Sequence, residues 1–285
     1  MSELPVRRLG ATGRQVSALG LGGEGVLRTF GYVAEAAAVI ERALAEGVTY
    51  MESARAYSGS EAYYGSTLGA RRGDIFLASK AHERSRDGAL TQLKTTLHTL
   101  RIDYLDLWQL HDVREWEEVN SFEDPGGAYA AFVEARERGL VRHIGVTGHH
   151  DPAVLRACLE RFRFDTVLLP VNPAEAARDA FVREVIPAAR ARGMGVIGMK
   201  VYARGLLLDP RIGLAPSDLV RYALSQDVDT VVVGFDDPAQ VAQAASAARS
   251  FTPMMPAEQA ALEARVAALA ARLTYYRRPQ PAARA

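Results

Sequence analysis

Four side chains that can exchange protons or stabilise charge stand near the ends of short β-rich runs. Glu52 and Lys80 each end such a run, and His111 directly follows a third. Tyr57 lies five residues after Glu52. A carboxylate, an ammonium, an imidazole and a phenol are together suited to proton transfer to or from a carbonyl oxygen. Any one of them alone would be interpreted as part of an ordinary ion pair, but the four together indicate an acid–base site.

A phenol beside a lysine has a definite electrostatic consequence. Tyrosine has an unperturbed pKa of about 10, so near neutral pH its phenol exchanges a proton with difficulty. At roughly 4 Å and an effective dielectric near 20, an ammonium favours the phenolate by about 4 kcal/mol, or about three pKa units before desolvation opposes the change. Lys80 is therefore expected to lower the pKa of Tyr57. Glu52 would hold the lysine charged, and His111 would hydrogen-bond the substrate oxygen.

These residues need a scaffold that brings strand ends together, and the rest of the sequence predicts one. β-rich runs alternate with helical patterns, which is typical of parallel strands joined by helical crossovers. Strands are predicted at residues 19–22, 48–52, 75–80, 104–110, 143–147, 166–170, 195–199 and 230–234. Helical patterns begin near Val33, Ser60, Arg86, Gly126, Asp151, Arg178, Pro216 and Pro238. Eight such units match an α/β fold, the (β/α)8 TIM barrel, whose active sites lie at the C-terminal strand ends.

The two ends of the chain are predicted to lie outside the repeating units. Residues 1–18 contain two short β-rich runs around a Gly-Ala-Thr-Gly turn, a pattern typical of a β-hairpin that could close one end of a barrel. Residues 256–273 are predicted as an extra C-terminal helix, and residues 275–285 as a flexible tail. A chain of 285 residues fits one domain of this kind without a second.

The composition narrows the classes of function. The 34 basic and 34 acidic residues give a formal net charge of +0, so no electrostatic field draws nucleic acid or an anionic membrane surface. No apolar run reaches the roughly 18 residues that would cross a membrane, and the N-terminus has no signal-peptide pattern. Cys158 is the only cysteine, so no intrachain disulfide can form. We expect a cytoplasmic protein, either a monomer or a small homo-oligomer, that binds neither nucleic acid nor membranes.

The segments that carry the four acid–base residues resemble the catalytic segments of the aldo-keto reductase superfamily. They are Gly47-Val-Thr-Tyr-Met-Glu-Ser-Ala-Arg-Ala-Tyr57, Phe76-Leu-Ala-Ser-Lys80 and Asp103-Tyr-Leu-Asp-Leu-Trp-Gln-Leu-His-Asp112, and the similarity covers nearly the whole chain. The resemblance implies an NAD(P)(H)-dependent oxidoreductase that interconverts an aldehyde, ketone or sugar lactol and the alcohol. Tyr57 would exchange the proton, Lys80 would adjust its pKa, and His111 would orient the substrate. Glu52 stands where the family usually carries aspartate, and its extra methylene moves the carboxylate by roughly 1 Å.

Later strands resemble the family's cradle for the nicotinamide nucleotide. Met199 takes the place of the usual aromatic side chain against the nicotinamide ring, where a thioether can still lie. Lys200 and Arg204 supply cations for the pyrophosphate. The implied cofactor contacts are Gly22, Thr147, Gly148, Asn172, Met199, Lys200, Tyr202, Arg204, Gly234, Asp236 and Gln240.

The charge at one of these positions favours one form of the cofactor. Family members that select a 2′-phosphate tend to carry arginine where this chain has Asp236. A carboxylate would repel the phosphate and accept hydrogen bonds from ribose hydroxyls, which favours NAD(H). NADP(H) stays open, because Arg204 or another cation could compensate.

Two further residues are candidates for contact with the small-molecule carbonyl or alcohol substrate. Trp116 lies in the acidic, irregular stretch 113–125, and loops of that length over a barrel mouth often line substrate pockets. His149 follows the fifth predicted strand at the same mouth.

Two other classes of function stay open. The first is a metal-dependent barrel hydrolase, since Glu52, His111, His149 and His150 have metal-ligating side chains at strand ends. Adjacent histidines are expected to point in different directions, however, and no H-x-H pair lies on a strand, so no metal is expected. The second is a nucleotide-binding regulatory barrel with weak or no turnover. The unusual Glu52 favours it, and the presence of a tyrosine, a lysine and a histidine with linked roles opposes it.

Overall fold

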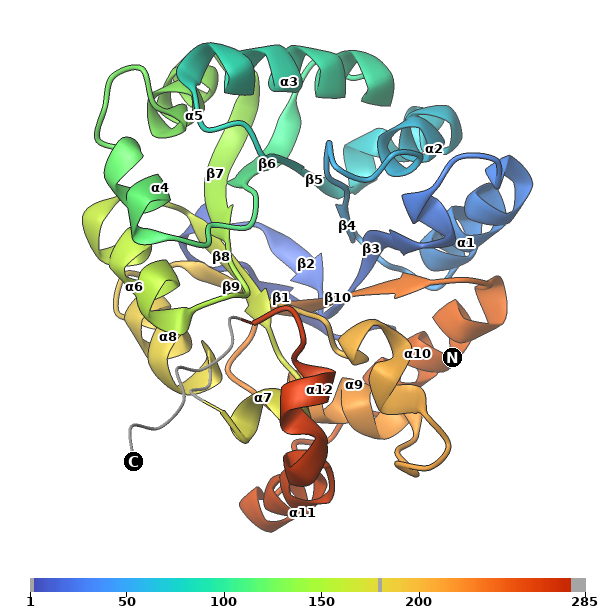
Figure 1. The fold of residues 1–285 in the computed structure, drawn as a ribbon. Helices are drawn as coiled ribbons and strands as arrows, with labels where there is room; N and C mark the ends of the chain where they lie inside the picture. Colours follow the sequence, from blue (N-terminus) through green and yellow to red (C-terminus); the bar gives the residue numbers. More distant parts are fainter. Residues whose placement is uncertain (1–2, 179–180, 278–285) are drawn as a thin grey trace, which may run out of the picture.

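Eight parallel strands close into a barrel in the computed structural model, which describes residues 3–178 and 181–277 (Figure 1). Each strand pairs with the next along the chain, and the last pairs with the first. The strands are β3 (Leu19–Gly25), β4 (Tyr50–Glu52), β5 (Phe76–Ala81), β6 (Leu105–Leu110), β7 (Val141–Thr147), β8 (Thr166–Pro170), β9 (Gly195–Met199) and β10 (Thr230–Phe235). The predicted (β/α)8 fold is confirmed, and every predicted strand overlaps an observed one.

Helices surround the barrel on its outer side (Figure 1). The longer ones are α1 (Val33–Ala45), α2 (Ser60–Thr67), α3 (Arg86–Leu100), α5 (Ala128–Glu137), α6 (Pro152–Arg161), α8 (Phe181–Arg190), α9 (Pro216–Leu224) and α10 (Pro238–Arg249). Two of them begin with an aspartate cap followed by proline: Asp151 accepts from the Ala153 N–H and Asp237 from the Ala239 N–H, each at 2.8 Å. An apolar core lies between these helices and the strands.

The predicted N-terminal hairpin, β1 (Val6–Arg8) and β2 (Gln15–Ser17), closes one end of the barrel. Leu9 and Val16 are fully buried and belong to the inner core formed by the barrel strands. The turn between them fits tightly, because a Cβ on Gly10 would lie 2.2 Å from the Gly195 nitrogen, and its φ is +48°. The mouth at the C-terminal strand ends is therefore the open one.

Three regions differ from the prediction. The stretch 113–125 is not irregular throughout, because it contains the helix α4 (Trp116–Ser121). A second short helix, α7 (Pro173–Ala176), precedes α8, and the predicted C-terminal helix is divided into α11 (Pro256–Val266) and α12 (Ala270–Leu273) by a 3-10 turn. No helix among the described residues is long and apolar enough to span a membrane.

The predicted tail also differs at its start. Tyr276 and Arg277 are buried against Glu175: the tyrosine hydroxyl donates to Oε1 at 2.5 Å, and the guanidinium lies 3.1 Å from Oε2. The C-terminal segment thus continues from α12 across the barrel mouth (Figure 1). Residues 278–285 lie outside the described residues.

Candidate active site

Three of the four predicted acid–base residues come from neighbouring strands. β4 ends at Glu52, Lys80 lies one residue before the end of β5, and His111 directly follows β6. Tyr57 lies in the turn between β4 and α2, where its N–H donates to the Ala54 carbonyl at 2.9 Å. Parallel strands bring their C-terminal ends to one mouth, so residues far apart in sequence meet there.

Glu52 and Lys80 form a buried ion pair. Lys80 Nζ lies 2.6 Å from Glu52 Oε1 and also donates to the Ser53 carbonyl at 3.0 Å. The second carboxylate oxygen, Oε2, accepts a hydrogen bond from Gln109 Nε2 at 3.3 Å. Burial alone would lower the pKa of Lys80, but the charge and hydrogen bond of Glu52, together with smaller effects of Tyr57 and Glu24, outweigh burial and raise it. The longer glutamate side chain therefore still reaches the lysine and keeps it charged.

Tyr57 lies close to this ion pair and lines the cavity beside it. Lys80 Nζ is 5.0 Å from the centre of its ring, and the His111 ring meets it edge-on with centroids 5.9 Å apart. Burial raises the pKa of Tyr57, while the Lys80 charge acts in the opposite direction without overcoming it. Lys80 therefore lowers the pKa of Tyr57 as expected, but desolvation outweighs the lysine in the protein alone, so the net shift is upward. The phenol is protonated at neutral pH.

His111 is a neutral imidazole in this environment. Burial, followed by the Lys80 charge, holds its pKa well below the usual range. Either ring nitrogen can thus carry the single proton, and the ring can donate a hydrogen bond to an oxygen bound beside Tyr57.

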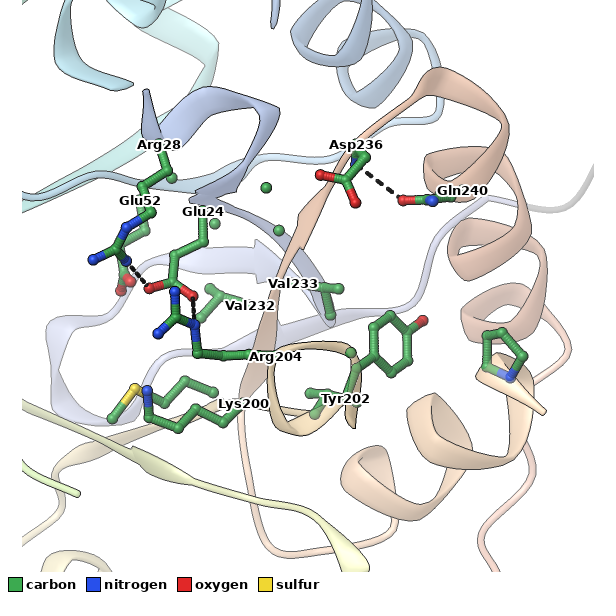
Figure 2. Close-up of a pocket in the computed structure, with 18 of the residues that line it drawn as sticks. Glu24, Arg28, Glu52, Lys200, Tyr202, Arg204, Val232, Val233, Asp236 and Gln240 are labelled. Carbon is green, nitrogen blue, oxygen red and sulfur yellow. Dashed lines mark hydrogen bonds and ion pairs between the residues drawn. The ribbon is translucent and has the colours of Figure 1, made fainter. Parts of the chain in front are cut away.

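A cavity of about 460 Å³ opens beside these four acid–base residues and runs toward β10 and α10 (Figure 2). Glu52 and Tyr57 line one end of it. The predicted cofactor contacts that line it are Gly22, Met199, Lys200, Tyr202, Arg204, Gly234, Asp236 and Gln240. The backbones pass very close at one wall, since a Cβ on Gly234 would lie 2.7 Å from the carbonyl carbon of Glu24.

The wall formed by the segment after β9 has an unusual backbone. Lys200, Ala203 and Arg204 all have positive φ, between 47° and 56°. Non-glycine residues seldom adopt this conformation, and they cluster where a site requires it. Burial lowers the pKa of Lys200, so this lysine at the cavity edge loses its charge at a lower pH than an ordinary lysine does.

Two charged residues at the cavity escaped the sequence analysis. Glu24, on β3, forms ion pairs with Arg28 and with Arg204, the latter at 3.7 Å (Figure 2). The Arg28 guanidinium also lies 5.2 Å from the centre of the Tyr57 ring. Glu24 and Arg28 come just after the predicted strand 19–22 and are four residues apart, and this spacing could have indicated the ion pair.

The far end of the cavity is the N-terminal turn of α10. Asp236 and Gln240 are both exposed there, and the Asp236 N–H donates to Gln240 Oε1 at 2.9 Å (Figure 2). Asp237 caps the helix.

The predicted carboxamide contacts lie outside the lining of this cavity. Thr147 Oγ1 accepts from the Asp112 N–H at 2.8 Å, and Asn172 donates to the Lys200 carbonyl at 3.0 Å while its Oδ1 caps α7. Gly148 is in close contact with its surroundings, since a Cβ there would lie 3.0 Å from the Val113 carbonyl. These residues fix the turns after β6, β7, β8 and β9.

The two predicted substrate contacts have different surroundings. Trp116 begins α4, is 45% exposed and does not line the cavity. The ring of His149 packs edge-on against Tyr276, with centroids 5.5 Å apart. Tyr276 is a mouth residue that the sequence analysis placed in the tail, and the aromatic pair at residues 275 and 276 could have indicated a packed segment.

The residues of the metal-hydrolase alternative do not converge as that alternative requires. Glu52 is bound to Lys80, and His111 faces Tyr57. The expectation that His149 and His150 diverge is also wrong, since their rings stack with centroids 4.7 Å apart.

Comparison with known proteins agrees with this geometry. The model of the aldo/keto reductase family matches residues 18–217. The chain is 28% identical over 225 residues to L-galactose dehydrogenase of Arabidopsis thaliana, covering 73% of this chain and 69% of that protein. It is 26% identical over 180 residues to methylglyoxal reductase DkgB of Salmonella typhimurium, covering 61% and 64%.

Solved structures share the fold. The holo form of an aldo-keto reductase from Bacillus halodurans superposes with a TM-score of 0.76 at 23% identity, covering 92% of this chain and 96% of that one. An aldo-keto reductase from Klebsiella pneumoniae in complex with NADPH superposes with a TM-score of 0.75 at 17% identity, covering 93% and 95%.

Proposed function

Because the chain belongs to the aldo/keto reductase family, we propose that Tyr57, Lys80 and His111 carry its proton chemistry. The chain is an NAD(P)(H)-dependent oxidoreductase that acts on a small-molecule carbonyl or alcohol. The observation that carries the assignment is the buried Lys80–Glu52 pair, 2.6 Å long, placed against the Tyr57 ring beside a cavity.

In carbonyl reduction Tyr57 donates its proton to the substrate oxygen. When bound, the reduced nicotinamide supplies the hydride to the carbonyl carbon. Lys80 stabilises the phenolate that remains, and Glu52 keeps the lysine charged. Neutral His111 donates a hydrogen bond to the same oxygen and fixes its approach.

The cavity residues fit a dinucleotide by charge and by shape. Lys200 and Arg204 would hold the pyrophosphate, and Met199 would lie against the ring. The close approach at Gly234 holds β10 against β3 at this wall, where any side chain would meet the Glu24 backbone. Thr147, Gly148 and Asn172 would shape the carboxamide end through the turns that they fix.

We propose NAD(H) as the preferred cofactor. Asp236 and Glu24 place two carboxylates at the cavity, and Arg204 would be shared between Glu24 and the pyrophosphate, so it would not compensate for a 2′-phosphate. A 2′-phosphate near Asp236 would meet like charge. Fluorescence titration with NADH and NADPH tests this preference, and clearly tighter binding of NADPH would contradict it.

The names of the relatives suggest the first substrates to assay, namely sugar lactols and 2-oxoaldehydes. Wild-type protein should turn over at least one class, and Tyr57→Phe should lower kcat by about 10²- to 10⁴-fold with cofactor affinity unchanged. Equal turnover by the variant would remove Tyr57 from its proposed role.

Charge balance and the single cysteine support a cytoplasmic location. Light scattering would distinguish a monomer from a small homo-oligomer.

A further inference from the structure

Three metal-ligating side chains that the proposed reaction does not use meet at the barrel mouth. Asp112 follows β6, and His149 and His150 follow the adjacent strand β7. His149 Nδ1 lies 3.1 Å from Asp112 Oδ1, and His150 Nε2 lies 3.4 Å from the same oxygen. Among the described residues, no other group of three such donors lies this close together.

These contacts are close without being hydrogen bonds. Asp112 Oδ1 and His150 Nε2 are both buried, and neither has a hydrogen-bond partner in the part of the chain that the structure describes. Buried polar atoms are rarely left unpaired. In a tetrahedral zinc site with bonds of about 2.0–2.2 Å, neighbouring ligand atoms are about 3.3–3.5 Å apart. The two measured separations are close to that spacing.

The carboxylate is held in place before any ligand arrives. Asp112 has a φ of +59°, and its N–H donates to Thr147 Oγ1 at 2.8 Å. Arg114 Nε donates to Oδ2 at 2.8 Å and leaves Oδ1 free to face the histidines. This prearrangement lowers the conformational cost of binding an ion.

We propose that Asp112, His149 and His150 bind one Zn²⁺ ion, and that the bound ion inhibits the enzyme. Two imidazoles and a carboxylate favour zinc over Mg²⁺ or Ca²⁺, which prefer oxygen ligands. His111 directly precedes Asp112 in the turn after β6, and the charges of Asp112 and His149 act on it, so a bound dication would place a further positive charge near that imidazole.

Isothermal titration of the chelator-treated full chain with ZnCl₂ tests the site, and visible absorption after CoCl₂ addition reports its coordination. Wild type should bind one equivalent. Asp112→Asn and His150→Ala should each weaken binding by at least about tenfold. His98→Ala, which removes an exposed histidine of α3, should bind as wild type does. Absent binding, or equal binding by wild type and His150→Ala, would overturn the site.

A second measurement tests inhibition separately from the proposed function. In the reductase assay, Zn²⁺ should inhibit wild type, while His150→Ala should keep its zinc-free turnover and become at least about tenfold less sensitive. Inhibition of equal strength in both proteins would overturn the regulatory role. The titration needs no turnover, so an inactive enzyme would contradict the proposed function and leave the metal measurement valid.

Discussion

The two sides of the barrel mouth are built on different principles. On the side of β4–β6, the acid–base residues stand at strand ends and are held by short, buried contacts such as the Lys80–Glu52 pair. On the side of β9 and β10, the cavity is walled by a segment with three left-handed residues and by part-exposed ion pairs of Glu24. The acid–base residues are thus held by regular elements, while the binding wall depends on a loop and on partly exposed ion pairs.

Lys80→Met should break the rigid side and give the largest effect. The substitution leaves Glu52 buried without its cation, so the free energy of unfolding should fall by about 3–5 kcal/mol. Chemical denaturation measures the loss, and adding Glu52→Gln should restore part of it. Lys94→Met, which removes an exposed lysine of α3, is the control and should change stability little. Equal stability of the two lysine variants would show that the pair is not the structural support described here.

Gly234→Ala should damage the binding wall while sparing the proton site. The new Cβ would meet the Glu24 backbone at 2.7 Å, so β3 and β10 must move apart, at a cost of about 1–3 kcal/mol. Cofactor affinity, measured by fluorescence titration, should fall by about tenfold or more. Gly73→Ala is a matched control, because a Cβ there meets nothing within 4 Å. Unchanged affinity in Gly234→Ala would place the cofactor away from this wall.

The smallest expected effect is a difference in pH dependence between kcat, which reports the acid–base side, and the cofactor Kd, which reports the binding wall. His111 is protonated only well below its usual range and Tyr57 loses its proton only above its own, so kcat for reduction should be nearly flat from about pH 6.5 to 9.5. The lowered pKa of Lys200 means that its charge is lost earlier as pH rises than in an ordinary lysine. The Kd for the cofactor should therefore increase first at alkaline pH. A fall in kcat near pH 6.5 would show that His111 titrates like a solvated histidine.

The strand ends could be predicted because local pattern and fold geometry agree there. Alternating β-rich and helical segments define the barrel, and the barrel rule brings Glu52, Lys80 and His111 to one mouth. Lys80 and Tyr57 lie near each other because β4 and β5 are neighbours and Tyr57 lies in the turn after β4. The direction of the Tyr57 pKa shift did not follow, because burial depends on everything packed around the ring.

The loops could not be predicted because their order comes from distant contacts. Tyr276 is fixed by Glu175, which is 101 residues away in the chain, and Arg204 is fixed partly by Tyr275. Similarly, the stacked pair of His149 and His150 faces Asp112 from another loop. Periodicity contains no information on such pairings.

The hairpin β1–β2 fills the end of the barrel opposite the active-site mouth and so limits how molecules reach the site. With Leu9 and Val16 buried inside that end, cofactor and substrate are expected to enter and leave through the mouth at the C-terminal strand ends.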